Sequence, residues 1–231
     1  MSIRKILEKL GVKMSEASAN PFDIEDFRRK RGLLWSTKPV LDSNDMFMFF
    51  PNNKVAQTSI NRNLLKDRVI VFKDDHSRYI GKMHSYDLEQ AERIFKFTVV
   101  RNPWDKAVSA FTYLQGVKQY KRKYSEMDFC FFVKHYLNKK GMGLDPHFNR
   151  QYENAFYNGI QYVDFIAKLE TLHDDWKEIA PKIDSPAELP HKNKTIHKKY
   201  TDYYDDESVE LVGQIYMKDV EAFGYTYGDP E

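Results

Sequence analysis

Short apolar runs alternate along the middle of the chain with segments whose apolar residues recur at helical spacing. Residues 46–50 (MFMFF), 68–72 (RVIVF) and 95–100 (FKFTVV) have the continuous apolar character of buried strands, and a further strand is expected at 162–166. The connections between the first three runs are long enough for crossover helices. The pattern predicts an α/β fold with a P-loop-like parallel sheet covered by helices on both faces.

Helix-start signals follow these strands. Thr58 or Ser59 is expected to cap a helix that continues to about residue 66, and a second helix is predicted over 86–93. After the run at 95–100, Asn102 and Pro103 have the residue types of a cap and a first helical position, and the helix is expected to end near Tyr113. The order is therefore strand, helix, strand, repeated.

The two ends of the chain have different patterns. Residues 1–44 predict short amphipathic helices and are interpreted as an accessory segment, and residues 45–231 as one α/β domain. Beyond residue 125 helical spacing dominates, and a last helix is expected from about 205 to Gly224. One face of the first of these helices is apolar: Phe129, Phe132, Val133, Tyr136 and Leu137. The C-terminal half is predicted to be mostly helical.

Composition removes several classes of protein. The chain has 231 residues with 36 Lys and Arg against 34 Asp and Glu, so its net charge of +2 argues against nucleic acid as the main partner. No apolar run approaches the roughly 20 residues of a membrane span. Charged residues interrupt the first 20 positions, which disfavours a signal peptide and indicates a cytoplasmic protein. A single cysteine, Cys130, excludes an internal disulfide and a multi-cysteine metal site.

The turn after the first strand carries candidate anion-binding groups. In open parallel sheets, ligands bind beyond the carboxyl ends of the strands. Here Lys54 supplies a positive charge, Thr58 and Ser59 supply hydroxyls, and the following helix start supplies N–H donors. The glycines of GxxxxGK[ST] are missing, which disfavours a nucleoside triphosphatase. The alternative is a capped helix beside a solvated lysine.

The turn after the third strand, at Arg101, is the second candidate. An arginine at the end of a buried strand needs an anion or a carboxylate, and its guanidinium fork suits a terminal phosphate. Ser109, in the second turn of the next helix, is placed to add a hydrogen bond. The alternative is an ion pair between Arg101 and a neighbouring acidic side chain.

Taken together, these turns resemble the sulfotransferases that use 3′-phosphoadenosine 5′-phosphosulfate (PAPS), most closely the carbohydrate (family 2-like) group. The resemblance spans residues 45–226 in order. It is most specific in FKFTVVRNPWDKAVSAF (95–111) and YMKDVEAFGY (216–225), and it extends to HFNRQY (147–152) and YVDFIAKLETLHDDW (162–176). Ala155 and Asn158 stand where secreted members carry a cysteine pair, which agrees with a reducing compartment.

The resemblance implies transfer of a sulfuryl group from PAPS to an acceptor hydroxyl, with a carbohydrate or glycoconjugate as the expected acceptor and no metal required. It implies that Lys54 stabilises the leaving oxygen. The 5′-phosphosulfate site would comprise Lys54, Val55, Ala56, Gln57, Thr58 and Ser59. The 3′-phosphate site would comprise Arg101 and Ser109.

An acceptor hydroxyl also needs a base, for which histidine is the usual side chain. His84, in the loop after the second strand, is the predicted base, with His76 as second candidate. His147 and Gln151 are interpreted as acceptor-side residues, or as packing residues. A basic loop at residues 192–194 (KNK) is a weaker candidate for covering the nucleotide.

Two other functions are compatible with the same strand, loop and helix frame. One is a nucleotide-dependent kinase, and the other is a non-catalytic module that binds a nucleotide or anion. The sulfotransferase is expected to bind PAP, the 3′,5′-bisphosphate product, more tightly than AMP. A thermal shift with Mg-ATP but not with PAP would favour the kinase, and no turnover on any acceptor panel would favour the non-catalytic module. The acceptor and the oligomeric state stay open.

Overall fold

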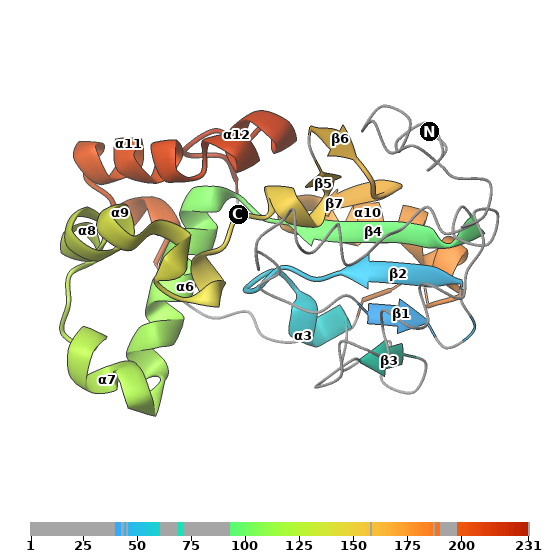
Figure 1. Ribbon diagram of the computed structural model, residues 1–231, viewed down its shortest axis with the longest axis horizontal. Helices are drawn as coiled ribbons and strands as arrows, with labels where there is room; N and C mark the ends of the chain where they lie inside the picture. Colours follow the sequence, from blue (N-terminus) through green and yellow to red (C-terminus); the bar gives the residue numbers. More distant parts are fainter. Residues whose placement is uncertain are drawn as a thin grey trace, which may run out of the picture.

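The computed structural model describes residues 40–42, 44, 46–60, 69–71, 93–157, 159–186, 188–189 and 198–230. A five-stranded sheet occupies one end of this part of the chain, and a group of helices lies at the other (Figure 1). The carboxyl ends of the central strands point toward the helices. The loops after these strands therefore lie between the sheet and the helical half.

The sheet has the order β3-β1-β2-β4-β7. Its three strands β2, β4 and β7 are parallel, with Phe49 beside Phe97 and Phe97 beside Phe165. A separate antiparallel pair, β5 and β6, follows later in the chain. The strand bounds are β1 (Val40–Asp42), β2 (Phe47–Phe50), β3 (Val69–Val71), β4 (Phe95–Val100), β5 (Phe156–Tyr157), β6 (Ile160–Gln161) and β7 (Phe165–Lys168).

The predicted parallel sheet is confirmed for its centre and differs at one edge. The apolar run at 68–72 forms β3, but β3 pairs antiparallel with β1, which is also antiparallel to β2. β1 falls within residues 1–44, for which the sequence predicted helices, so the boundary predicted at residue 44 cuts through the sheet. The predicted helices before residue 40 lie outside the described residues, as does nearly all of the one at 86–93.

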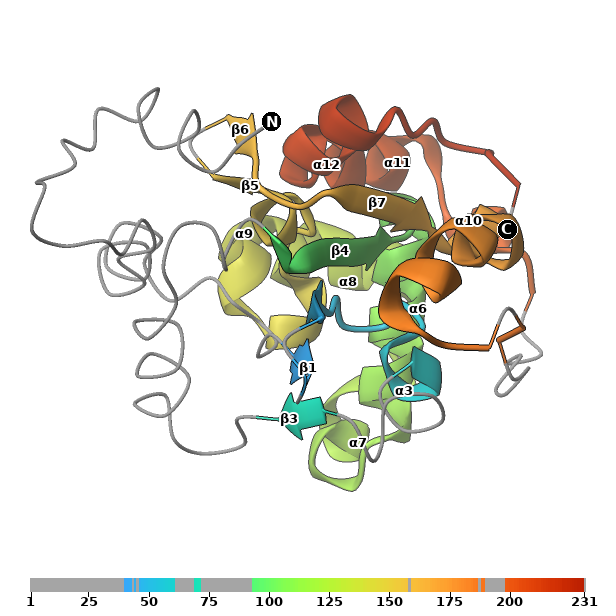
Figure 2. The ribbon, with the colours of Figure 1, turned by 90° about the vertical axis from the view of Figure 1, so that its right-hand side faces the viewer.

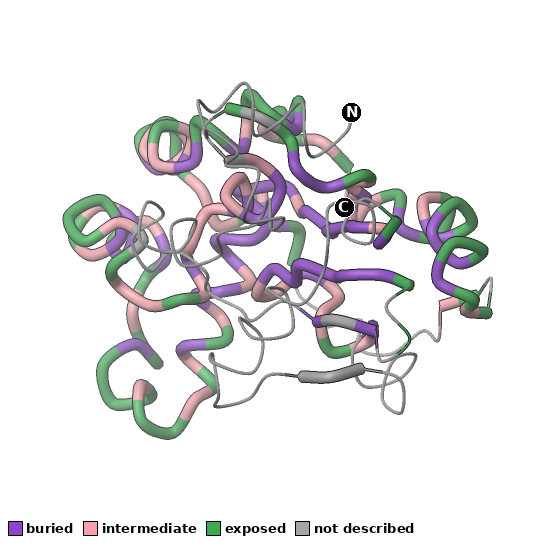
Figure 3. The backbone as a smooth tube through the Cα atoms, turned by 45° about the vertical axis from the view of Figure 1, so that its right-hand side comes forward, coloured by how far each residue is buried: buried purple, intermediate pink, exposed green. Residues whose placement is uncertain are grey.

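The central strands β2 and β4 are buried on both faces (Figure 3), as expected of strands with continuous apolar sequence. Side chains alternate along β2, so Phe47 and Phe49 pack on one face while Met48 and Phe50 pack on the other. The first face is covered by α10 (Leu172–Ile179), as Figure 2 shows. Trp176 of this helix makes an edge-on contact with Phe97, at 6.5 Å between ring centroids. The second face packs against the helical half.

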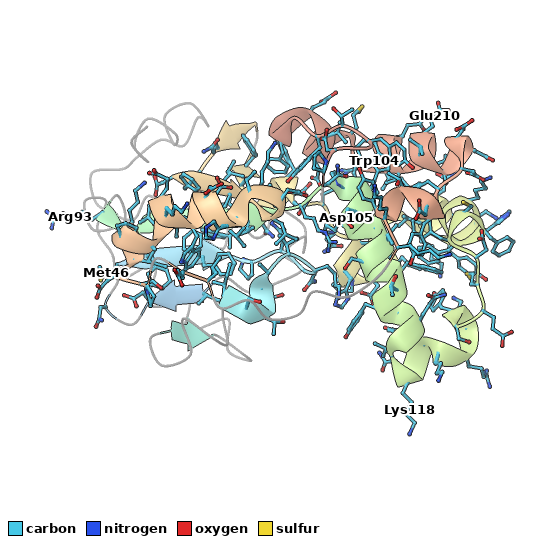
Figure 4. The ribbon with its side chains drawn as sticks, turned by 180° about the vertical axis from the view of Figure 1, so that it is seen from behind. Met46, Arg93, Trp104, Asp105, Lys118 and Glu210 are labelled. Carbon is cyan, nitrogen blue, oxygen red and sulfur yellow. The ribbon has the colours of Figure 1, made fainter. Side chains whose placement is uncertain are left out.

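The helical half begins directly at the end of β4. Asn102 is the cap of α6 (Pro103–Gly116), its side chain accepting from the Trp104 N–H at 3.0 Å, with Pro103 in the first turn. The predicted start is confirmed, and the helix ends three residues beyond Tyr113. Trp104 Nε1 donates to the carbonyl of Val209 at 2.9 Å, which joins α6 to α11 (Figure 4).

The remaining helices are short. The last predicted helix is interrupted at Tyr216, which separates α11 from α12, and a capping box of Asp205 and Ser208 starts α11. No helix among the described residues is long and apolar enough to span a membrane. The bounds are α3 (Gln57–Ser59), α7 (Lys118–Tyr124), α8 (Phe129–Phe132), a π-helical turn (Val133–Leu137), α9 (Asn138–Lys140), α11 (Asp206–Ile215) and α12 (Met217–Phe223). Turns of 3-10 helix cover Gly141–Gly143, Pro146–Phe148, Tyr152–Asn154, Leu169–Thr171, Ala180–Ile183 and Tyr200–Tyr203.

Candidate functional site

The loop after β2 has an unusual backbone. Lys54 and Ala56 have φ angles of 66° and 45°, in the left-handed region that residues with a Cβ rarely adopt. Such a conformation costs about 1–2 kcal/mol per residue, so the surrounding contacts must impose it. The conformation of this loop is therefore fixed by its contacts with the rest of the fold.

Asparagines supply those contacts. Asn52, which is buried, donates to Thr98 Oγ1 at 3.1 Å and to the Val99 carbonyl at 2.9 Å. Asn154 donates to Asn52 Oδ1 at 2.7 Å and to the Pro51 carbonyl at 3.1 Å. The loop is thus fixed to the neighbouring strand β4 on one side and to the helical half on the other.

Lys54 lies at the turn of this loop and is partly buried. Its Nζ is 4.7 Å from the centroid of the Tyr113 ring on α6. Burial, and then the positive charge of Arg101, lower the pKa of Lys54. A desolvated ammonium interacts more strongly with an anion than a solvated one does.

The structure also places Val55, Thr58 and Ser59, other residues of this turn that were predicted to bind the ligand. The helix α3 begins at Gln57, and Ala56 occupies the cap position without a side-chain bond, so the prediction that Thr58 or Ser59 caps the helix is wrong. Both hydroxyl residues lie within the first turn instead. Val55 is completely buried in the core under the sheet. Only its backbone remains for a ligand.

Arg101 stands at the end of β4 and makes a two-pronged ion pair. Its Nε and Nη2 donate to the two carboxylate oxygens of Asp105, at 2.6 and 2.7 Å. Its Nη1 donates to the Lys54 carbonyl at 3.2 Å, which brings the two predicted turns together. Ser109 follows Asp105 by four residues, so it lies on the same side of α6 and is half-buried. The acidic partner that the sequence allowed for Arg101 is present.

Gln151 holds the backbone of Arg101. Its Oε1 accepts from the Arg101 N–H at 2.8 Å, and its Nε2 donates to the Arg101 carbonyl at 2.7 Å. The side chain is fully buried. Because both ends of the amide are used in this way, Gln151 positions Arg101, which agrees with the packing role that the sequence left open for it.

Two buried charged residues hold the segment around Gln151. Asp219 accepts from the N–H groups of Gln151 and Tyr152, and burial raises its pKa to about 6. Lys106 donates to the carbonyls of His147 and Asn149 at 3.0 and 2.7 Å. Burial lowers the pKa of Lys106 to about 8, partly opposed by the charge of Asp219.

His147, like Lys54, lies beside the ring of Tyr113. Its Nδ1 is 2.6 Å from Asp145 Oδ1, and its ring centroid is 4.4 Å from that of Tyr113. Tyr113 is therefore adjacent to both Lys54 and His147. His84, His76 and residues 192–194 lie outside the described residues, so the structure does not bring them to this site or away from it.

The sequence pattern does not indicate that several of these residues belong to the site. Tyr113 and Asp219 are separated from their partners by long stretches of chain, and a buried lysine such as Lys106 runs against the usual exposure of that residue type. Within the described ranges, no three His, Cys, Asp or Glu side chains are grouped to hold a metal ion. The site thus consists of cationic groups, hydroxyls and one histidine with its carboxylate.

Comparison with known proteins gives one match. The family described as "Sulfotransferase family" matches residues 39–226, which is most of the chain and includes β1 as well as the α/β core. No curated protein and no solved structure gave a match.

Proposed function

The chain belongs to the sulfotransferase family, and on this basis we propose that it transfers a sulfuryl group from PAPS to a hydroxyl of a carbohydrate or glycoconjugate. That it is a sulfotransferase follows from the family. The donor and the acceptor are the proposal. We further propose a reducing compartment, which the single cysteine supports.

The contact between Arg101 Nη1 and the Lys54 carbonyl carries the proposal for the donor. PAPS has an anionic group at its 5′ end and another on its 3′ oxygen, so a site for it needs two cationic points at a fixed separation. Lys54 and Arg101 come from two neighbouring parallel strands and are joined directly. Their arrangement supports one ligand bridging both.

The donor supplies an activated sulfuryl group on a phosphate leaving group. In such a transfer the protein positions the reactants and neutralises charge on the leaving oxygen, with little covalent chemistry of its own. Lys54 is proposed to stabilise that oxygen, assisted by the hydroxyls of Thr58 and Ser59 and by the backbone of residues 55–57. Arg101 and Ser109 are proposed to bind the 3′-phosphate.

The ion pair with Asp105 is compatible with this role. Asp105 uses Nε and Nη2 of the guanidinium and so fixes its plane, while Nη1 is turned toward the Lys54 loop. A preoriented arginine loses less rotamer entropy when it binds an anion. The predicted base His84, with His76 second, stays a prediction.

Calorimetry with PAP and with AMP tests the donor. Because AMP lacks the 3′-phosphate, PAP is expected to bind at least tenfold more tightly, and equal affinities would exclude the proposed donor. Transfer from radiolabelled PAPS to a panel of saccharides tests the acceptor. A thermal shift with Mg-ATP, without one for PAP, would favour the kinase alternative instead.

A further inference from the structure

We propose that His147, oriented by Asp145, accepts the proton of the acceptor hydroxyl during transfer. This inference rests on the proposed function. It assigns the base to the segment between α9 and β5, which the Lys54 loop contacts through Asn53. The sequence had interpreted His147 only as an acceptor-side or packing residue.

The contact with Asp145 gives the imidazole a defined tautomer. Asp145 Oδ1 is 2.6 Å from His147 Nδ1 and also accepts the backbone N–H of His147 at 2.9 Å. The other carboxylate oxygen accepts the Tyr120 hydroxyl at 3.2 Å. A carboxylate in this position keeps the proton on Nδ1, which leaves Nε2 as the basic nitrogen.

The position of His147 relative to Lys54 is what a base for this reaction requires. The Tyr113 ring has the imidazole 4.4 Å from its centroid and the Lys54 ammonium 4.7 Å from it. Asn53, beside Lys54, donates to the Pro146 carbonyl at 3.2 Å, so the loop and the His147 segment are in direct contact. The base and the cation that stabilises the leaving oxygen thus flank one side chain, which is itself 41% exposed and accessible to an acceptor.

The backbone around His147 is held at almost every residue. Lys106 donates to the carbonyls of His147 and Asn149, and the Tyr216 hydroxyl donates to the Phe148 carbonyl at 2.7 Å. Asp219 accepts hydrogen bonds from the backbone N–H groups of Gln151 and Tyr152. An irregular segment fixed by this many buried side chains holds His147 in one position, as a catalytic group requires.

The step is balanced as follows. The acceptor hydroxyl oxygen forms a bond to sulfur, the bond from sulfur to the 5′-phosphate oxygen breaks, and its electron pair stays on that oxygen beside Lys54. The hydroxyl proton moves to Nε2 of His147, and the resulting imidazolium, stabilised by Asp145, later releases it to water. The products are a sulfate ester, the bisphosphate and a proton.

The charged and titratable groups that face His147 are Asp145 on its own turn, Lys54 across Tyr113, Tyr113 and Tyr120 with their hydroxyls, and the Lys106 ammonium at its carbonyl. Because the imidazole must be neutral to accept a proton, kcat/KM of the native chain is expected to fall on the acid side. Another essential histidine, such as His84, would give the same fall, so the variants described next assign the fall to one residue.

The test compares His147→Gln with two other histidine variants of the full chain. His135→Gln is the matched control. His135 lies exposed on the π-helical turn, where its ring packs at a tilt against Phe131, with the ring centroids 4.3 Å apart. His84→Gln tests the base predicted from the sequence. General-base catalysis contributes about 10²- to 10⁴-fold, so His147→Gln is expected to lower kcat by that factor, with PAP affinity and the thermal midpoint unchanged.

The pH profile separates a base from a structural histidine. His147→Gln is expected to flatten the acid-side fall of kcat/KM, and Asp145→Asn to reduce kcat by a smaller factor while the fall remains. Wild-type kcat in His147→Gln, or an acid-side fall that disappears in His84→Gln and persists in His147→Gln, would overturn the inference. A native chain that does not prefer PAP over AMP removes the proposed donor instead, so the two failures are distinct.

Discussion

Substituting Arg101 with Gln has two consequences that the structure allows to be separated. The guanidinium holds Asp105 through two hydrogen bonds of 2.6 and 2.7 Å, and the side chains of both residues are largely buried, at 11% and 4% exposure. The substitution therefore leaves a buried carboxylate without its cation. It also removes the group proposed to bind the 3′-phosphate.

The expected magnitudes differ for stability and for binding. Breaking a buried ion pair by removing one partner costs about 3–5 kcal/mol of unfolding free energy. Losing charge-assisted hydrogen bonds to a phosphate costs about 1.5–3 kcal/mol, which corresponds to a dissociation constant for PAP that rises by roughly ten- to hundredfold. AMP, which lacks the 3′-phosphate, is expected to bind equally well to both chains.

The double variant Arg101→Gln with Asp105→Asn is the control. Its two amides can pair with each other, so the buried charge is gone and much of the stability is expected to return. The affinity for PAP is not expected to return, because no cation is left at the end of β4. Urea denaturation measures the first quantity and calorimetry the second.

The result that would refute this reasoning is a double variant that binds PAP as tightly as the native chain. Arg101 would then serve only as the partner of Asp105, which is the alternative that the sequence left open. A single variant that is destabilised but binds PAP normally would lead to the same conclusion.

Three further predictions concern the site and the core. Lys54→Ala is expected to lower kcat by about 10²- to 10³-fold. Because burial and Arg101 lower the pKa of Lys54, the native chain should lose activity at a lower alkaline pH than an ordinary lysine would give, and Lys54→Arg should remove that alkaline fall in steady-state kinetics. Burial raises the pKa of Asp219 to about 6 from 3.8, so the folded chain binds this proton more tightly than the unfolded one. The stability that this proton contributes is therefore full below about pH 4 and is lost as the pH rises through about 6. In Asp219→Asn, the free energy of unfolding should therefore depend less on pH between these values. Phe97→Ala, at a position with no exposed surface, should cost about 3–5 kcal/mol in urea denaturation, and a cost below 1 kcal/mol would contradict the packing described for the sheet.

The elements that the sequence predicted well are those with a strong local signal. The strands β2 and β4 are continuous apolar runs, and the start of α6 follows from Asn102 and Pro103 alone. Each of these signals lies within a few residues, so no knowledge of the partner is needed. The strand predicted at 162–166 lies farther along the chain in the structure, at Phe165–Lys168.

The antiparallel edge could not be predicted in the same way. β1 has three residues, too few for a periodic pattern, and it follows a segment with helical spacing. The direction of β3 depends on β1, with which it pairs, and not on its own composition. A parallel arrangement was the natural expectation from the order of strands and helices.

The site shows the same limit at the level of single residues. Lys54 and Arg101 were identified because each follows a strand, and their proximity follows from neighbouring parallel strands. Asp105 is the neighbouring acidic side chain that the sequence allowed for Arg101. The contact with Gln151 could not be predicted, since Gln151 is fifty residues from Arg101 and nothing local marks its amide as buried. The left-handed backbone at Lys54 likewise depends on Asn52 in the same loop, whose hydrogen-bond partners Thr98 and Asn154 are distant in the sequence.

The restraints on Arg101 explain how two halves of the chain can form one site. Asp105 fixes the guanidinium from α6, Gln151 fixes the backbone from the segment after α9, and Asp219 on α12 fixes Gln151 in turn. The bonds made by Gln151 and Asp219 join elements that are far apart in the sequence, and each of them ends on a backbone group. A backbone group cannot be moved by a rotamer change, so the position of Arg101 depends on the packing of the whole helical half against the sheet. We therefore expect changes at Asp219 on α12 to affect Arg101 at the end of β4 through Gln151.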